Sequence, residues 1–416
     1  MLGNTDKPKK AVTPRYRAKR DLILDAAARR INAAGAHGMT LGDVAASVGM
    51  NATSVTYYFR RREQLAAACY DQSLDRIEGI VTDAERAAGP RERVRAYVAA
   101  HFAQHAAIRA QHARPCAVLS DLRALDGPER AALAERYRGL LRRIRGFFGN
   151  GDKALLTART HVLVEATLWL PSWLNQHDLD EYPRLSARMV ELFDGGLALP
   201  DAAWAPRRTR LDPGMAADED GARHNFLMAA TRLINERGYR GASVERIASE
   251  LNVTKGSFYH HLGGKDELVV DCFTHSFDVQ VAALRLAEAA GGSQWEKLCS
   301  AMAMLLDVQF SDQGPLLRTT ALHALPPDLR GQMAARTNHL TRRLAGMVID
   351  GISEGTLRAI DPLVASHALA AMLNAAYELR NWAGERPDTP SAIADYASTL
   401  CHGLFAATPL VDRRAG

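Results

Sequence analysis

Residues 252–268, NVTKGSFYHHLGGKDEL, contain the pattern that decides the fold of this chain. This stretch places a Lys, a Ser, a Tyr and two His within one or two helical turns. A Gly-Gly pair then interrupts the helix, and a new helix opens with Lys-Asp-Glu. A related segment, GMNATSVTYYFRRREQL, occupies residues 49–65, which lie 203 positions earlier. The chain of 416 residues is therefore expected to contain an internal repeat.

The repeat extends well beyond this pattern. Residues 24–50 align with 227–253 at the same offset, and residues 114–130 align with 314–330 at an offset of 200. Paired identities include Leu24/Leu227, Asn32/Asn235, Ser54/Ser257 and Cys69/Cys272. Each half is thus a complete unit of about 190 residues, so two units in one chain are expected.

Both units carry the signals of two short helices joined by a tight turn. The expected elements, each with its N-cap first, are Thr40 with 41–48, Asn51 with 52–58, Ser243 with 244–251, and Thr254 with 255–260. Two helices joined in this way form a helix-turn-helix. The second helix of such a motif can enter the major groove and read base edges, while nearby Lys and Arg bind phosphates. The polar groups crowded on this helix are therefore interpreted as a DNA-reading surface.

TKGSFYHHLGGKDEL and SVTYYFRRREQL resemble the third helix and the start of the fourth helix in the TetR/AcrR family of transcriptional regulators. The family pattern is approximately K-G-x-x-Y-x-Y/H-F-x-x-K-E-x-L, and about 50 residues in each half match closely. The resemblance implies an N-terminal three-helix DNA-binding domain in each unit. It also implies a larger helical domain that holds a small-molecule pocket and ends in two dimerisation helices.

The resemblance implies a set of DNA-contacting residues in each unit. In the second unit Lys255, Gly256 and Tyr259 match the family pattern, as does Lys265, whereas in the first unit Ala52-Thr53 replaces Lys-Gly. The first unit thus loses a cation and is expected to read DNA differently. The predicted contacts are Thr40, Asn51, Ala52, Thr53, Ser54, Thr56, Tyr57, Tyr58 and Arg62 in the first unit, and Ser243, Thr254, Lys255, Gly256, Ser257, Tyr259, His260 and Lys265 in the second.

Composition excludes several other classes of protein. The chain is 47% hydrophobic and 24% charged, and it has no apolar run of 18 residues, so no membrane span is expected. The five cysteines are scattered without a C-x-x-C or a His/Cys cluster, which predicts reduced thiols, no metal site and a cytoplasmic protein. No catalytic motif and no cofactor motif occurs, so the chain is not expected to be an enzyme.

Several residues leave alternatives open. Trp169, Trp173 and Tyr377 are candidates for a ligand-pocket wall, although core or interface packing is the favoured interpretation. Four basic residues, His101, His105, Arg109 and Arg114, either face an anionic ligand or lie on the surface. Cys69 and Cys272 are either a redox sensor or small buried groups. The basic N-terminal arm is either a solvated tail or a minor-groove contact.

These observations predict an all-α fold of two tandem TetR-like units, with domains at 1–16 (basic arm), 17–62 (first DNA-binding domain), 63–199 (first helical domain), 200–222 (linker), 223–265 (second DNA-binding domain) and 266–410 (second helical domain). The expected partners are double-stranded operator DNA and a small-molecule effector. The units are expected to pair with each other as an intramolecular pseudo-dimer, and a further homodimer of two chains stays open. Repression that a ligand relieves is the usual mode of the family, so the resemblance implies a ligand-responsive repressor. Because the recognition helices differ, its operator should have unlike half-sites. Two other functions stay open, a ligand-sensing adaptor and an enzyme that uses the helical pocket.

Overall fold

The computed structural model describes residues 13–119, 122, 125, 128–207, 211, 221–256, 259, 264–311, 315–325 and 327–406. In these residues the regular structure is helical, apart from isolated bridge residues, which include the pair Ala198 and Leu357. No helix among them is long and apolar enough to cross a membrane. The all-α prediction is confirmed.

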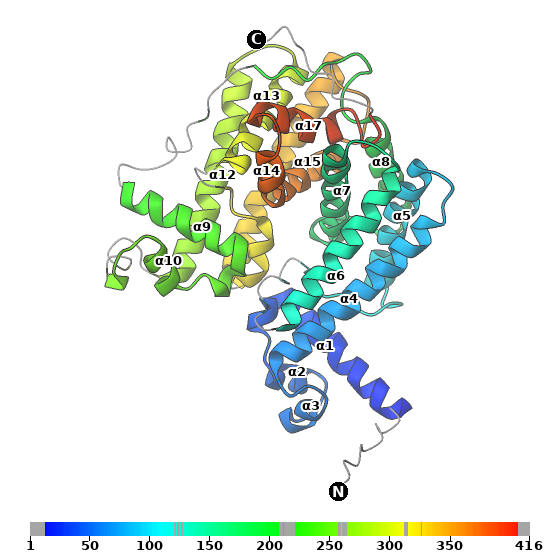
Figure 1. The fold of residues 1–416 in the computed structure, drawn as a ribbon, viewed down its shortest axis with the longest axis vertical. Coiled ribbons are helices and arrows are strands. Elements are labelled where there is room, and N and C mark those ends of the chain that lie inside the picture. The colour runs from blue at the N-terminus through cyan, green and yellow to red at the C-terminus, as the bar shows by residue number, and fades with distance from the viewer. Residues whose placement is uncertain are drawn as a thin grey trace, which may run out of the picture.

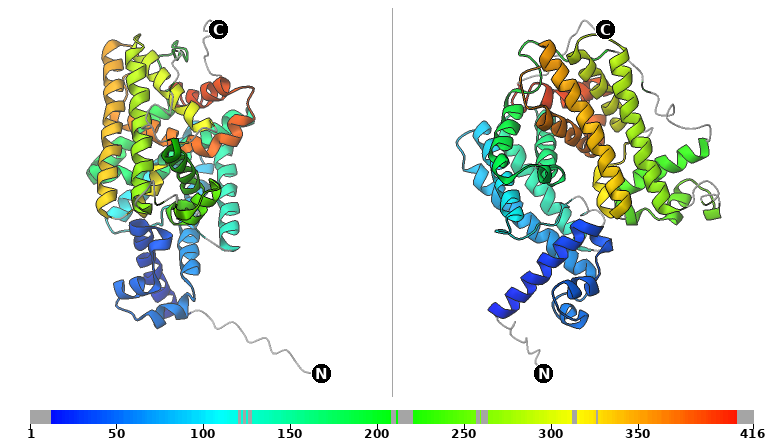
Figure 2. Two further views of the ribbon diagram at one scale, coloured as in Figure 1. Left: turned by 90° about the vertical axis from the view of Figure 1, so that its left-hand side faces the viewer. Right: turned by 180° about the vertical axis from the view of Figure 1, so that it is seen from behind.

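The first unit runs from the helix-turn-helix at the lower end of Figure 1 into a helical domain above it. Figure 2 shows from two further directions that its first three helices project from the rest of the molecule. Its α-helices are α1 (Pro14–Gly38), α2 (Leu41–Ser47), α3 (Ala52–Tyr58), α4 (Arg62–Glu85), α5 (Pro90–Arg109), α6 (Pro128–Arg145), α7 (Lys153–Leu168) and α8 (Tyr182–Gly195). Short 3-10 turns follow α6 and α7, namely η2 (Gly146–Phe148), η3 (Leu170–Ser172), η4 (Leu174–Gln176) and η5 (Leu179–Glu181).

The second unit repeats this order, and its DNA-binding helices lie at the left edge of Figure 1. Its described elements are α9 (Gly221–Gly241), α10 (Val244–Glu250), α12 (Lys265–Ala289), α13 (Gln294–Phe310), η7 (Thr319–Ala324), α14 (Pro327–Glu354), α15 (Pro362–Ala376), η8 (Tyr377–Leu379), α16 (Arg380–Gly384) and α17 (Thr389–Cys401).

Local chemistry explains where the short helices begin. The Thr40 hydroxyl accepts the Asp43 N–H at 3.0 Å, and the Asn51 side chain accepts the Ser54 N–H at 2.7 Å. In the second unit Ser243 accepts the Arg246 N–H at 3.3 Å. These bonds satisfy amide groups that have no partner inside a helix, so the three predicted N-caps are confirmed.

The turn between the two short helices has the same backbone in both units. Gly49 has φ of 66° and its counterpart Asn252 has φ of 54°. Asn is one of the few residues with a side chain that tolerate this left-handed conformation. The repeat therefore preserves the geometry of the turn although the residue has changed.

The two units pack against each other through the helices at the end of each unit. Helix α7 packs most extensively against α15, and α17 contacts both α7 and α8. Buried apolar side chains of both units form one continuous core. Main-chain hydrogen bonds also cross the boundary, from the Arg358 N–H to the Leu197 carbonyl at 3.0 Å and from the Leu404 N–H to the Phe193 carbonyl at 2.7 Å.

The start of the predicted linker is docked on the second unit. Trp204 is buried, the Trp295 indole donates to the Ala203 carbonyl at 2.8 Å, and the Arg207 N–H donates to the Ser300 hydroxyl at 2.9 Å. Most of the remaining linker, 208–210 and 212–220, lies outside the described residues, as do residues 1–12 of the basic arm. Residues 203–207 therefore belong structurally to the packed body and not to a free connection.

Candidate DNA interface and effector cavity

The first recognition helix, α3, is held by two buried side chains and presents polar groups outward. Val55 is fully buried and Phe59 is nearly so, whereas the Tyr57 side chain is 74% exposed. Tyr16 of α1 contacts the ring of Tyr58 at a centroid distance of 4.7 Å. The remaining predicted contacts on this helix, Asn51, Ala52, Thr53, Ser54 and Thr56, are exposed or partly exposed. The arrangement leaves this face of α3 available to a groove of DNA.

Arg62, which stays a predicted DNA contact, makes hydrogen bonds and an ion pair within the chain. Its guanidinium donates to the His37 carbonyl at 3.1 Å and pairs with Glu63 at 2.8 Å. The amide at the start of α4, together with Arg62, lowers the pKa of the Glu63 carboxyl. In the structure, Arg62 thus ties the start of α4 to the end of α1.

In the second unit, Lys255 and Tyr259 are both exposed on the predicted recognition helix. Lys255 pairs with Glu245 of α10, and this ammonium lowers the pKa of Glu245 to about 2. A Cβ added at Gly256 would meet only the Thr254 hydroxyl, at 3.7 Å. The fold therefore leaves open space at Gly256, as close approach of another molecule to the backbone requires.

The other predicted contacts of the second unit divide into two groups. Lys265 lies 4.5 Å over the ring of Tyr239, which fixes the start of α12 against α9. Ser257 and His260 lie outside the described residues.

A pair of asparagines connects each DNA-binding domain to its helical domain. Asn32 of α1 donates to the Cys116 carbonyl at 2.7 Å and accepts the Val118 N–H at 2.9 Å. Its counterpart Asn235 of α9 donates to the Leu316 carbonyl and accepts the Arg318 N–H, both at 3.0 Å. We call these contacts the asparagine latches. These contacts were not predicted, although the identity of Asn32 and Asn235 in the repeat was a signal for them.

A cavity of about 250 Å³ lies in the first unit beside its asparagine latch. Its polar wall includes Asn32, Ser73, His101, Gln104, His105, Arg109, Cys116 and Tyr182, and its apolar wall includes Ile77, Ile108, Leu119 and Leu174. Burial lowers the pKa of His101 to about 3 and that of His105 to about 4. Both imidazoles are therefore neutral at pH 7 and offer hydrogen bonds rather than charge.

Three of the four basic residues that the sequence left open between a ligand contact and a surface position line this cavity. Arg109 donates to the Tyr182 hydroxyl at 3.1 Å and to the carbonyls of Leu174 and His177, so it braces the wall of the cavity. The fourth, Arg114, instead pairs with Asp21 of α1 at 2.9 Å.

The matching region of the second unit is almost filled. The cavity there measures about 30 Å³. The buried Gln309 side chain donates to the Leu373 carbonyl at 2.8 Å and accepts the Leu316 N–H at 3.2 Å. Arg318 is also buried, and it pairs with Glu378 and, at 3.5 Å, with Glu165 of the first unit. At these matching positions, the first unit therefore has an open cavity, whereas side chains fill most of the space in the second unit.

The aromatic candidates from the sequence lie around the boundary between the units. Trp173 is buried and stacks on His367 of the second unit, with ring centroids 4.7 Å apart. Trp169 lines the small cavity of the second unit. Arg380 lies over the ring of Tyr377 at 5.6 Å. A ligand contact for these three residues stays a prediction.

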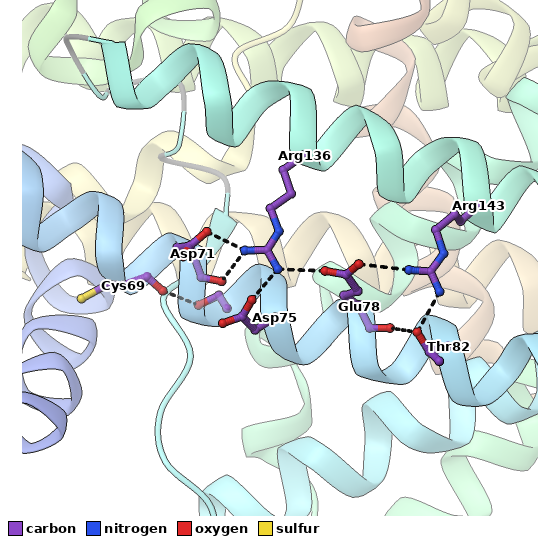
Figure 3. A network of polar contacts seen from close by, with 8 residues as sticks. Cys69, Asp71, Asp75, Glu78, Thr82, Arg136 and Arg143 are labelled. Carbon is purple, nitrogen blue, oxygen red and sulfur yellow. Dashed lines mark hydrogen bonds and ion pairs between the residues drawn. The ribbon is translucent and has the colours of Figure 1, made fainter. Parts of the chain in front are cut away.

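An ion-pair network, which we call the α4–α6 network, holds α6 along α4 (Figure 3). Arg136 contacts Asp71 at 2.5 Å, Glu78 at 2.8 Å and also Asp75. Arg143 contacts Glu78 at 3.2 Å. Because α4 starts next to α3 and continues beside the cavity, this network attaches α6 to the helix that runs between the two sites.

Comparisons with known proteins agree with this architecture. Residues 23–69 and 226–272 both match the family described as bacterial regulatory proteins, tetR family, and residues 291–403 match the tetracyclin repressor-like C-terminal domain. The HTH-type transcriptional regulator BetI of Brucella abortus is 26% identical over 186 residues, 44% of this chain and 92% of BetI. The HTH-type transcriptional activator FasR of Mycolicibacterium smegmatis is 28% identical over 129 residues, 31% of this chain and 59% of FasR.

Among solved structures, apo AibR is similar, with a TM-score of 0.37 and 20% identity over 43% of this chain and 98% of AibR. The two helix-turn-helix domains, the helical domains behind them and the twofold family match define a class of DNA-binding regulators. The chain belongs to the TetR family and is a TetR-type transcriptional regulator with two DNA-binding units in tandem.

Proposed function

We propose that this chain is a ligand-responsive repressor whose two units act as an intramolecular pseudo-dimer on one operator. The observation that supports this most strongly is the packing of α7 and α8 against α15 and α17 within one chain. A shared core and main-chain hydrogen bonds between the units favour one rigid body that carries both recognition helices. A dimeric helix-turn-helix protein reads two half-sites about 34–36 Å apart.

The operator should have unlike half-sites, because the two recognition helices present different groups. Ala52, Thr53 and Tyr57 lie on the first helix, and Lys255, Gly256 and Tyr259 lie on the second. Base readout depends on the hydrogen-bonding groups that reach the groove, so different side chains select different bases. A palindromic operator would fit only one of the two helices.

The effector is proposed to bind in the cavity of the first unit. A cavity of about 150 Å³ is large enough for benzene, so about 250 Å³ admits a larger molecule. The cavity touches the first latch through Asn32 and also helix α7 through Thr167. On α7, Glu165 forms an ion pair with the Arg318 guanidinium. The backbone N–H of Arg318 donates to the Asn235 side chain in the second latch. Effector binding that shifts these contacts would move both DNA-binding domains and lower DNA affinity.

The test is the solution mass of the protein, alone and on the intergenic DNA beside its own gene. We expect a free mass near the 45.4 kDa of one chain, and one chain per footprint with unlike half-sites. Twice that mass on a longer palindrome would contradict the pseudo-dimer. No footprint at low salt would favour a ligand-sensing adaptor, because phosphate contacts bind most strongly at low salt.

A further inference from the structure

The five cysteines of the chain differ sharply in their surroundings. Cys69, Cys272, Cys299 and Cys401 are buried, and burial raises the pKa of the Cys69 and Cys272 thiols to about 12. These four thiols are neutral and inaccessible, as structural cysteines are. Cys116 alone is partly exposed, and it lines the cavity of the first unit.

Two hydrogen-bond donors are directed at the Cys116 sulfur. Arg76 Nη1 lies 2.9 Å from Sγ, and Gln104 Nε2 lies 3.0 Å from it. Both donors fix the position of the sulfur, and both can also donate to the thiolate form that attacks carbon. The second unit has Val279 and Leu316 at the positions that match Arg76 and Cys116 in the repeat. The surroundings of this thiol are thus specific to the first unit.

An independent feature of the same cavity points to a missing polar partner. His101 is 3% exposed, and its Nε2 has no hydrogen-bond partner among the described residues. Leaving a buried polar atom without a hydrogen-bond partner is energetically unfavourable. A ligand with a hydrogen-bonding group would remove this cost, and a ligand carbonyl oxygen fits an imidazole that donates from this nitrogen.

We propose that Cys116 is a covalent binding site for a small uncharged α,β-unsaturated carbonyl compound. The inference rests on the proposed function, because it names the class of effector for that cavity. The sulfur attacks the β-carbon, a C–S bond forms and the carbon–carbon π bond breaks. The electron pair moves to the carbonyl oxygen as an enolate, and the proton released by the thiol ends on the α-carbon. Atoms and electrons balance without an oxidant.

An adduct at Cys116 would act directly on the first asparagine latch. The Cys116 carbonyl accepts the hydrogen bond of Asn32, which lies on α1 of the first DNA-binding domain. Arg76 also holds the carbonyls of Arg114, at 2.6 Å, and of Pro115, at 3.2 Å. A carbon substituent on sulfur displaces the Arg76 and Gln104 donors and so shifts the segment that the latch grips. Alkylation therefore weakens the hold of the first unit on DNA.

The experiment treats the full-length protein with one equivalent of N-ethylmaleimide, which is an uncharged unsaturated imide. We expect one adduct by intact mass, mapped to Cys116, and no fast adduct on Cys116→Ser. DNA affinity, measured by fluorescence anisotropy on the intergenic fragment, should fall about tenfold on treatment. The affinity of Cys116→Ser should not change on treatment.

Two further variants test the geometry around the sulfur. Arg76→Met and Gln104→Leu should each slow adduct formation several-fold, and urea unfolding checks that each variant is folded. Labelling of Cys116 no faster than of the urea-unfolded chain would overturn the proposal, as would an adduct that leaves DNA affinity unchanged. If the untreated protein binds no DNA, the proposed function fails, and the labelling rates still decide whether Cys116 is an activated site.

Discussion

The two units share a fold but differ at the positions where a regulator meets its ligands. Counted from the first residues of α5 and α13, Pro90 and Gln294, the histidines at 101 and 105 correspond to Leu305 and Gln309. Gln309 closes the second cavity, whereas His101 and His105 line an open one. Conversely, the second unit has the recognition-helix cation Lys255, and the first has Ala52 there. From this comparison we infer that the first unit binds the effector and that the second unit contributes more electrostatic affinity for DNA.

The buried Arg318 should give the largest difference between matched substitutions. Arg318→Met leaves Glu165 and Glu378 partly buried without their cation, so we expect the free energy of unfolding to fall by about 3 kcal/mol. The matching change in the first unit, Val118→Met, alters only apolar packing and should cost less than about 1.5 kcal/mol. Urea unfolding measures both, and equal losses would mean that the ion pairs do not distinguish the units.

A pH titration of stability should reveal the neutral His101 in the open cavity. Since its pKa falls from 6.5 to about 3 in the fold, the unfolded chain binds more protons between those values. Stability is therefore fully present above pH 6.5 and is lost as pH falls toward the folded pKa. We expect His101→Gln to reduce the loss between pH 7 and pH 5 by about 2 kcal/mol. Parallel pH profiles for the two proteins would contradict this account of the first cavity.

The salt dependence of DNA binding tests the difference between the recognition helices. Lys255→Ala should weaken binding a few-fold and reduce the slope of log K against log salt by about 1. Ala52→Lys at the matching position of the first unit should raise the slope by a similar amount. Anisotropy titrations at several salt concentrations measure both slopes. Unchanged slopes would place both side chains away from phosphates.

Substitution of the two matched arginines that contact α4 and α12 should give the smallest change in the free energy of unfolding. Arg136 contacts three carboxylates, whereas its counterpart Arg336 contacts only the Thr274 hydroxyl among the described residues, at 2.9 Å. Because these groups are largely exposed, we expect Arg136→Ala to lower the unfolding free energy by about 1 kcal/mol and Arg336→Ala by less. A larger loss for Arg336→Ala, measured by urea unfolding, would contradict the comparison.

Local signals in the sequence were enough to predict most of the DNA-binding domains. Thr40, Asn51 and Ser243 are caps in the structure, and helices α2, α3 and α10 end within one residue of the predicted positions. Such elements depend on residues three or four positions apart, so a single sequence contains the information. The internal repeat likewise required only a comparison of the chain with itself.

The cavities could not be predicted in the same way. Residues of the open cavity come from α1, α4, α5, the 115–119 segment, α7 and the helices after it. The asparagine latches join positions more than 80 residues apart. Whether Trp173 faces a ligand or stacks on His367 depends on how the two units pack. The sequence by itself determined an all-helical tandem repeat with two helix-turn-helix motifs, because periodicity and capping act locally. Only the tertiary structure decided that the first unit has an open cavity and that side chains fill most of the matching region of the second unit. The reason is that side-chain packing between distant segments sets the space that remains.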